Sequence, residues 1–369
     1  MAKEKKKALA KAAAASPTTA STQSSWSLDD LFTPQGALLA VGFCFFLSGA
    51  FKTLNGLYNE IIYDMREQVL PPHLLSSAEL DRIHATLSGD KFAFFGGWRK
   101  NKTMLGGMNR ALVNGEHIIL EEFFDVELAT KYRAELKSGH AKGWFKGEGP
   151  IAFEATGIDM AAYADVGPAK RCQTFRELHE KGGAFQFKYH AAQPHAEGAS
   201  ATLGVSIDKT PAISRVTRSM RSRSFIDAFG MLLSGQPAPT GFRFNDPTVR
   251  VFAPGDYTLL HTDRTSGGQN GLSQHRALCM NYYLTESDWH SEWGGGFLWC
   301  GAPKEANESS SNSAKAEETE AVRLVPGFNR ANLFVPTKST SWHAVEVVEP
   351  EATGLRLSFT SWMALPAGW

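Results

Sequence analysis

Residues 253–263 read APGDYTLLHTD, a turn-forming segment followed by a short apolar run that ends in His261-Thr262-Asp263. The chain after Thr240 repeats this pattern of short β-prone runs separated by Gly, Pro and Asp. Such spacing is typical of antiparallel barrels and jelly rolls. Strands are expected at 249–252, 258–261, 277–284, 296–299, 322–325, 331–335, 342–348 and 355–362. We therefore expect a mostly β domain with flanking helices and a jelly-roll core at about 240–365.

The segments before residue 240 carry the patterns of the flanking helices and strands. Asp125 is a typical helix N-cap, and the apolar spacing after it predicts a helix that runs through Leu136. Further strands are expected at 117–124 and 185–189, and further helices at 57–69, 77–88 and 215–233.

Changes in composition suggest where the parts of this 369-residue chain begin and end. The expected parts are a basic, Ala/Ser/Thr-rich tail at 1–30, a hydrophobic anchor at 31–58, a neck at 59–114 and a globular domain at 115–369. The interval 302–321 is rich in Glu, Ser, Asn and Ala and has no apolar period. We expect a mobile surface insertion there.

Residues 31–51 contain no charged side chain, and an uncharged segment of this length is long enough to form a transmembrane helix. Five lysines within residues 1–11 favour a cytosolic tail. We therefore expect a single-pass type II membrane protein with its globular domain in the lumen of the endoplasmic reticulum or Golgi. The sequons at Asn101 and Asn307 fit a lumenal domain. A cleaved signal peptide and an organelle transit segment are the alternatives.

Charge and cysteine spacing exclude some classes of function. The chain has 38 Lys and Arg against 38 Asp and Glu, so no nucleic-acid partner is expected. The four cysteines show neither the CxxC spacing of a zinc site nor the pattern of a disulfide framework. The redox compartment therefore cannot be read from them.

The His261-Thr262-Asp263 tripeptide is the first candidate for a metal site. Residues i and i+2 of a strand project to the same side, so an imidazole and a carboxylate would meet. With His343 from a later strand they would form the facial triad that binds ferrous iron. Considered by itself, His343 could equally be a buried histidine whose ring nitrogens are hydrogen-bonded within the core and bind no metal.

A second candidate lies on the last expected strand. Alternation places Arg356, Ser358, Thr360 and Trp362 on one face, with leucines and a phenylalanine on the other. An isolated buried charge is strongly disfavoured, and a guanidinium binds carboxylates through two parallel hydrogen bonds. Arg356 is therefore expected either to bind a carboxylate ligand or to pair with a structural acid.

From about residue 117 to 364 the chain resembles the prolyl 4-hydroxylase superfamily of Fe(II)/2-oxoglutarate-dependent dioxygenases. The blocks that carry the resemblance are 253–257 with 261–263, then RALCMNYYL at 276–284, WGGGFL at 293–298, NLFV at 332–335, WHAV at 342–345 and RLS at 356–358. The resemblance implies a double-stranded β-helix, the jelly roll of this family.

The same resemblance implies the cofactors and their residues. His261, Asp263 and His343 would bind Fe²⁺, with 2-oxoglutarate and O2 as cosubstrates and ascorbate as an expected reductant. Arg356 would hold the distal carboxylate of 2-oxoglutarate, with Ser358 as a possible second contact.

Two tyrosines complete the set that the resemblance implies. Tyr283 matches a tyrosine that hydrogen-bonds the same carboxylate in related enzymes. Alternation points it inward together with Ala277, Cys279 and Asn281. Tyr257 is a weaker candidate for the pocket wall. Some related enzymes have a tyrosine near Phe252, so the cosubstrate pocket is expected to differ there.

The expected reaction is hydroxylation of a C–H bond in a protein or peptide, a prolyl residue first, with release of succinate and CO2. Arginine rather than lysine at Arg356 is similar to the protein-hydroxylating branch of the family. The same chemistry on a lysyl or small-molecule substrate is one alternative, and an inactive jelly-roll binding protein is another.

Overall fold

The computed structural model describes residues 70–148, 166–180, 187–194, 210–263, 275–286, 288–301, 321–337 and 340–365. The chain divides into two compact units, Met1–Ile61 and Ile62–Trp369, and every described residue belongs to the second. The expected anchor at 31–58 and the interval 302–320 of the expected insertion lie outside the described residues. Among the helices that are described, none is long and apolar enough to cross a membrane.

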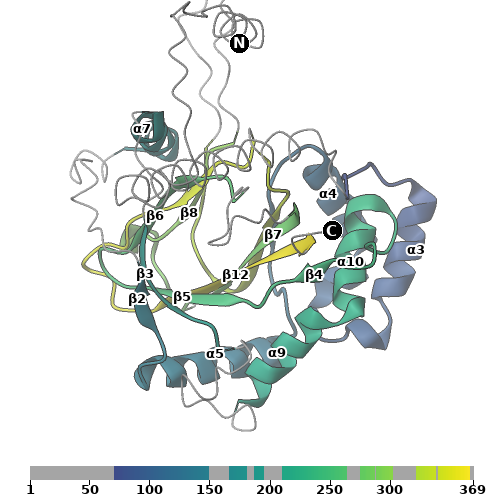
Figure 1. Cartoon of the computed structure of the whole chain (residues 1–369), viewed down its shortest axis with the longest axis horizontal. Helices are drawn as coiled ribbons and strands as arrows, with labels where there is room; N and C mark the ends of the chain where they lie inside the picture. The colour runs from purple at the N-terminus through teal and green to yellow at the C-terminus, as the bar shows by residue number, and fades with distance from the viewer. Residues whose placement is uncertain are drawn as a thin grey trace, which may run out of the picture. The chain divides into compact units, whose positions relative to one another are not determined.

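Within the described residues, twelve strands form one curled antiparallel sheet (Figure 1). They are β1 (Ile118–Leu120), β2 (Lys146–Glu148), β3 (Phe187–Ala192), β4 (Arg243–Phe244), β5 (Thr248–Phe252), β6 (Tyr257–His261), β7 (His275–Leu284), β8 (Phe297–Trp299), β9 (Val322–Leu324), β10 (Phe328–Phe334), β11 (His343–Val345) and β12 (Arg356–Leu365). The expectation of a mostly β domain with short strands after Thr240 is confirmed.

The strand order makes a jelly-roll-like half-barrel of two halves. It runs β1-β10-β7-β12-β5-β3-β6-β11-β8-β9, with β2 added to β3 and β4 to β12. Strand β3 pairs with β5 through one part of its length and with β6 through another. It therefore joins the larger half, which contains β12 and β7, to the smaller half, which contains β6, β11 and β8.

Helices cover the outside of this sheet. They are α3 (Ser77–Leu87), α4 (Lys102–Val113), α5 (Val126–Ala141), α7 (Pro168–Glu180), α9 (Pro211–Arg221) and α10 (Arg223–Ser234), with 3-10 turns η2 (Asp90–Phe92), η3 (Gly97–Lys100) and η6 (Ser291–Trp293). Helices α3, α4, α5, α9 and α10 lie along the larger half, and α7 lies near β6 and β8 (Figure 1). The apolar residues of β12 face these helices, so the main core forms there and the opposite face of β12 is left for a site.

The segment expected as a neck contributes to this main core from residue 70 onward. Ile83 and Leu87 of α3 and Leu105 and Leu112 of α4 are buried in the same cluster as Phe359 of β12. Burying side chains of this size stabilises the fold by roughly 1.5–3 kcal/mol each. Residues 70–113 are thus packed as part of the domain that carries β12.

Two helix predictions had different outcomes. Asp125 caps α5 as expected, since its Oδ1 accepts a hydrogen bond from the backbone N of Leu128, although α5 continues to Ala141. The single helix expected at 215–233 was wrong, because the chain is extended at Ser222 and forms two helices. The Ser222 hydroxyl accepts from the backbone N of Phe225 and so begins α10.

A disulfide joins Cys172 of α7 to Cys300, which follows β8, across 128 residues of sequence. The cysteine spacing did not predict it, because pairing over that distance depends on the packing of α7 against the smaller half of the sheet. Among the described cysteines, Cys279 is free and buried.

Candidate functional site

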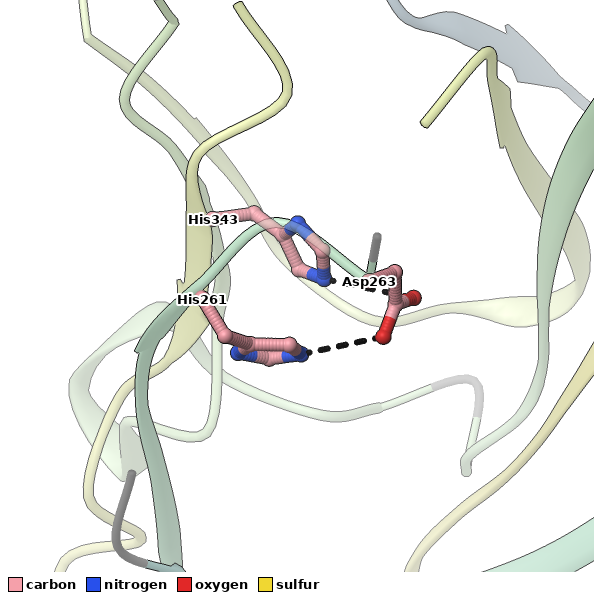
Figure 2. Close-up of side chains that lie close together, drawn as sticks. All are labelled: His261, Asp263 and His343. Carbon is pink, nitrogen blue, oxygen red and sulfur yellow. Dashed lines mark ion pairs between the residues drawn. The ribbon is translucent and has the colours of Figure 1, made fainter. Parts of the chain in front are cut away.

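His261, Asp263 and His343 lie together at the edge where β6 pairs with β11. His261 is the last residue of β6 and His343 the first of β11, and the two are direct partners in the ladder. His261 Nε2 lies 3.4 Å from one Asp263 oxygen, and His343 Nε2 lies 3.6 Å from the other. Figure 2 shows both rings directed at the carboxylate, and one ligand atom from each residue lies within 4.8 Å of the others.

Asp263 reaches this position in a way that strand alternation does not describe. Strand β6 ends at His261, and Asp263 has a φ of 56° in the left-handed region. Asp is among the few residue types besides Gly that occupy this region without large strain. The carboxylate therefore meets His261 through a turn after the strand end, rather than by extension of the strand as the sequence suggested.

Hydrogen bonds orient both imidazoles. Nδ1 of His261 lies 2.8 Å from the carbonyl oxygen of Leu259, and Nδ1 of His343 lies 2.8 Å from that of Ser341. A carbonyl can only accept, so Nδ1 carries the proton and Nε2 presents a lone pair toward Asp263. Burial, followed by the nearby His261, lowers the pKa of His343 to about 3, so this ring is neutral and ready to ligate.

A cavity of about 350 Å³ opens beside the triad and contains most of the expected cosubstrate residues. Arg356, Tyr283 and Ser358 line it together with the three triad residues. The alternation expected for β12 is confirmed: Arg356, Ser358, Thr360 and Trp362 line the cavity, whereas Leu357 and Phe359 belong to the main core.

Arg356 is buried, with 1% of its surface exposed, and meets only neutral groups. Its Nε donates to the carbonyl oxygen of Gly295, and its Nη1 lies 3.2 Å from Oγ of Ser358. Its guanidinium carbon stands 4.2 Å above the Phe252 ring. No ion pair found among the described residues includes Arg356. Burial lowers the pKa of Arg356 to about 10, so its guanidinium is still charged at neutral pH.

Tyr283 supplies an unused hydrogen-bond group at the same place. Its hydroxyl is buried and faces the Asn332 amide without a well-formed hydrogen bond to any described residue, and its ring centre lies 5.7 Å from the Arg356 guanidinium carbon. Buried polar atoms normally form hydrogen bonds. A buried hydroxyl without a well-formed hydrogen bond, beside an arginine without an ion pair, therefore indicates a ligand position. Together with Ser358 these groups fit a carboxylate of a bound molecule.

Tyr257 does not line the cavity, contrary to our expectation. It is fully buried with Cys172 and Phe175 of α7, on the outer side of β6. The alternation of β6 explains this, because Thr258 and Leu260 face the cavity and Tyr257 therefore faces away.

Arg276 lines the cavity instead of Ala277, which the alternation of β7 had placed inside. The register between β7 and β12 shifts between the pairs Met363–Leu278 and Ala364–Arg276, so the alternation is interrupted. Ala277 packs on the main core, and Arg276 stacks 4.0 Å over the ring of Trp362 and donates to the backbone oxygen of Asp263.

Arg250 of β5 also lines the cavity and was not anticipated. The period-2 pattern could have shown that Arg250 shares a face with Phe252. The expected place of Phe252 at the cosubstrate pocket was the one signal that this face of β5 is the inside, and it was not extended to Arg250.

The comparison with protein families agrees with this geometry. Residues 247–364 match the model of the 2OG-Fe(II) oxygenase superfamily. This matched segment carries the triad and Arg356, and within it the chain is similar to members of that superfamily. His261, Asp263, Tyr283, His343 and Arg356 all fall within the matched segment. That family implies Fe²⁺, 2-oxoglutarate and O2. The triad offers two nitrogens and a carboxylate to iron, and Arg356 with Tyr283 offers unpaired donors to a carboxylate, so the residues fit both groups.

Similarity to individual proteins is weaker than similarity to the family model. No curated protein matches the chain significantly. A prolyl-4-hydroxylase from Pseudomonas putida is 14% identical, with 71% of this chain and 100% of that one covered at a TM-score of 0.40. A Trichoplax adhaerens prolyl hydroxylase, solved with a hypoxia inducible factor peptide fragment, is 15% identical, with coverages of 79% and 94% and a TM-score of 0.41. A prolyl 4-hydroxylase from Phytophthora capsici is 15% identical, with coverages of 80% and 68% and a TM-score of 0.40. Superpositions with TM-scores of this size carry no argument about function.

Proposed function

We propose that this oxygenase hydroxylates a C–H bond of a protein or peptide, with a prolyl residue as the first target to examine. One observation carries the proposal. A single cavity contains both the His261, Asp263 and His343 triad and the buried Arg356, which forms no ion pair with the described residues. A triad of this composition leaves open positions on ferrous iron, and the arginine accounts for a cosubstrate carboxylate.

Each part of the cavity has a task in this reaction. Bound ferrous iron would supply oxygen activation, and 2-oxoglutarate would be converted to succinate and CO2. His261, Asp263 and His343 would hold the metal, and the Nδ1 hydrogen bonds of the two histidines keep their Nε2 atoms oriented. Arg356 and Tyr283 bind and orient the cosubstrate carboxylate. Phe297 and Val345, which also line the cavity, help to exclude water.

The choice of substrate rests on the resemblance of the sequence blocks to prolyl 4-hydroxylases. The arginine at Arg356 is similar to that of the protein-hydroxylating branch, so a prolyl peptide is the first substrate class proposed. A lysyl or small-molecule substrate is the alternative that the same chemistry allows. Ascorbate is proposed as the reductant that keeps the iron ferrous between turnovers.

The test is succinate release by the purified protein with Fe²⁺ and 2-oxoglutarate, followed by mass spectrometry of prolyl, lysyl and control peptides for the gain of one oxygen. We expect succinate release that depends on both additions, and a prolyl peptide that gains oxygen. His261→Ala should abolish both signals. An inactive binding protein would release no succinate, and equal turnover by His261→Ala would remove the metal assignment.

We also propose that residues 31–58 anchor the protein as a single-pass type II membrane protein, with the oxygenase in the lumen of the endoplasmic reticulum or Golgi. The charge-free run and the lysine-rich start support the anchor. The Cys172–Cys300 disulfide supports an oxidising compartment. Fractionation of cells that express the full chain tests this: the protein should resist extraction by salt or alkali and require detergent. Quantitative release without detergent would exclude the anchor.

A further inference from the structure

Arg250 lies on the same inner face as Arg356, one strand away. Strands β5 and β12 pair so that Phe252 is opposite Arg356 and Arg250 is opposite Ser358. Both arginines line the cavity beside the triad. The two guanidinium groups therefore belong to one site, although no feature of the proposed function so far uses Arg250.

The contacts of Arg250 leave part of its hydrogen-bonding capacity unused. Its Nη1 donates to Oγ1 of Thr360, and its guanidinium carbon lies 5.0 Å from the ring centre of Tyr189. Its Nε is buried and has no hydrogen-bond partner. No ion pair in the part of the chain that the structure describes includes Arg250. It is thus a second cation in the cavity without an acidic partner.

The pairing of β12 with β7 shows where the head of Arg250 lies. Thr360, which receives its hydrogen bond, is opposite Asn281, and the next inner pair is Trp362 with Cys279. Cys279 in turn contacts Asp263, with 3.1 Å from Sγ to Oδ2. Along β12, Arg356 is therefore farthest from the metal triad. The Arg250 guanidinium lies between them, beside Thr360, and the triad lies near the position of Trp362.

Two neighbouring cations in one cavity disfavour each other. Burial is the first cause that lowers the pKa of Arg356, and the charge of Arg250 acts in the same direction. Asp263, the acid that lines the cavity, already faces both triad imidazoles. A ligand with two negative charges, one for each arginine, would offset this repulsion.

We propose that Arg250 is a second arginine for the cosubstrate and binds its carboxylate nearest the metal triad, while Arg356 binds the far carboxylate. The inference rests on the proposed function. It makes the cavity selective for a dicarboxylic 2-oxo acid. Arg250 recognises the carboxylate beside the metal, and Arg356 with Tyr283 recognises the carboxylate at the other end.

Three small molecules separate the two ends. 2-Oxoglutarate has both carboxylates, 2-oxopentanoate lacks the far one, and 4-oxopentanoate lacks the one that would lie beside the metal. Their dissociation constants are measured by calorimetry on the Zn²⁺-loaded protein, which cannot turn over, so no substrate is needed. The variants are Arg250→Gln and Arg356→Gln. Arg215→Gln, at an exposed arginine of α9, is the charge-matched control.

We expect Arg250→Gln to weaken 2-oxoglutarate and 2-oxopentanoate by about 10- to 100-fold and to leave 4-oxopentanoate unchanged, because hydrogen bonds to charged groups have this magnitude. Arg356→Gln should weaken 2-oxoglutarate and 4-oxopentanoate and leave 2-oxopentanoate unchanged. The control should bind all three molecules as the wild type does. Arg250→Lys keeps the charge if the Gln variant does not fold, and should lose less affinity because it retains a point charge without the planar fork.

Two results would overturn the inference while the wild type still binds 2-oxoglutarate. Loss of 4-oxopentanoate affinity in Arg250→Gln, with 2-oxopentanoate unaffected, would place Arg250 at the far carboxylate. Unchanged affinity for all three molecules, in both the Gln and the Lys variants, would show that Arg250 does not contact the cosubstrate. Failure of the wild type to bind 2-oxoglutarate would instead refute the proposed function itself.

Discussion

The thiol of Cys279 donates a hydrogen bond to Oδ2 of Asp263, with 3.1 Å between sulfur and oxygen. Cys279 lies on β7 in the larger half of the sheet, whereas Asp263 follows β6 in the smaller half. Burial, then the charge of Asp263, raises the pKa of this thiol well above its usual value, so the sulfur keeps its proton and acts as the donor. The contact ties the carboxylate of the triad to the opposite wall of the half-barrel.

This contact predicts that Cys279 holds the triad carboxylate in position. Cys279→Ala should weaken Zn²⁺ or Co²⁺ binding by about 10-fold, since groups that orient metal ligands commonly contribute 10- to 100-fold. Cys279→Ser retains a donor and should remain closer to the wild type. Metal titration of the purified variants measures both affinities. Equal metal affinity of the Ala variant and the wild type would show that the turn at Asp263 orients the carboxylate without help.

Tyr283→Phe separates binding from stability at the cosubstrate end of the cavity. The hydroxyl faces the Asn332 amide but forms no well-formed hydrogen bond with the described residues, so its removal should leave the free energy of unfolding unchanged or slightly raised. The affinity for 2-oxoglutarate should fall by about 5- to 10-fold, the value of roughly 1 kcal/mol for one hydrogen bond. Denaturant unfolding and calorimetry on the same samples measure the two quantities. A destabilised variant with unchanged affinity would assign the hydroxyl a structural role.

The Cys172–Cys300 disulfide should contribute substantially to stability, because it closes a long segment of chain between α7 and β8. Replacing both cysteines by serine is expected to lower the free energy of unfolding by about 2–5 kcal/mol, the usual range for native disulfides. A reducing agent should bring the wild type to the stability of the double variant and leave that variant unaffected. Thermal denaturation with and without reductant measures the difference. Identical melting in all four samples would mean that the disulfide does not form in solution.

Glu346 is buried between two arginines behind β11, and its loss should be costly. Its two oxygens accept from Arg171 of α7 and from Arg323 of β9, with 1% of its side chain exposed. Glu346→Gln removes a buried negative charge that both arginines contact, so we expect about 3–5 kcal/mol of destabilisation. Glu127→Gln breaks an exposed pair with Lys131 and should change stability by less than about 0.5 kcal/mol. Urea unfolding of both variants makes the comparison, and similar small effects would contradict the prediction.

Local patterns in the sequence were sufficient for features that depend on one segment. The period of two places Arg356 and Ser358 opposite Leu357 on β12, and Asp125 caps α5 because a capping residue acts within three positions. The order His261, Asp263, His343 and Arg356, together with the resemblance of the blocks around them, was enough to propose a metal triad and a carboxylate partner. A jelly-roll class followed from the spacing of short strands, because turn residues recur at regular intervals.

Tertiary structure alone decided which face of each strand is the inside and which distant residues meet. Tyr257 faces α7, a register shift exchanges Ala277 for Arg276, and Arg250 joins Arg356 only because β5 pairs with β12. The disulfide likewise requires α7 to pack on the smaller half of the sheet. The physical reason is that alternation determines only which residues share a face. Strand pairing, bulges and helix packing determine what that face meets, and these depend on contacts between segments far apart in the chain.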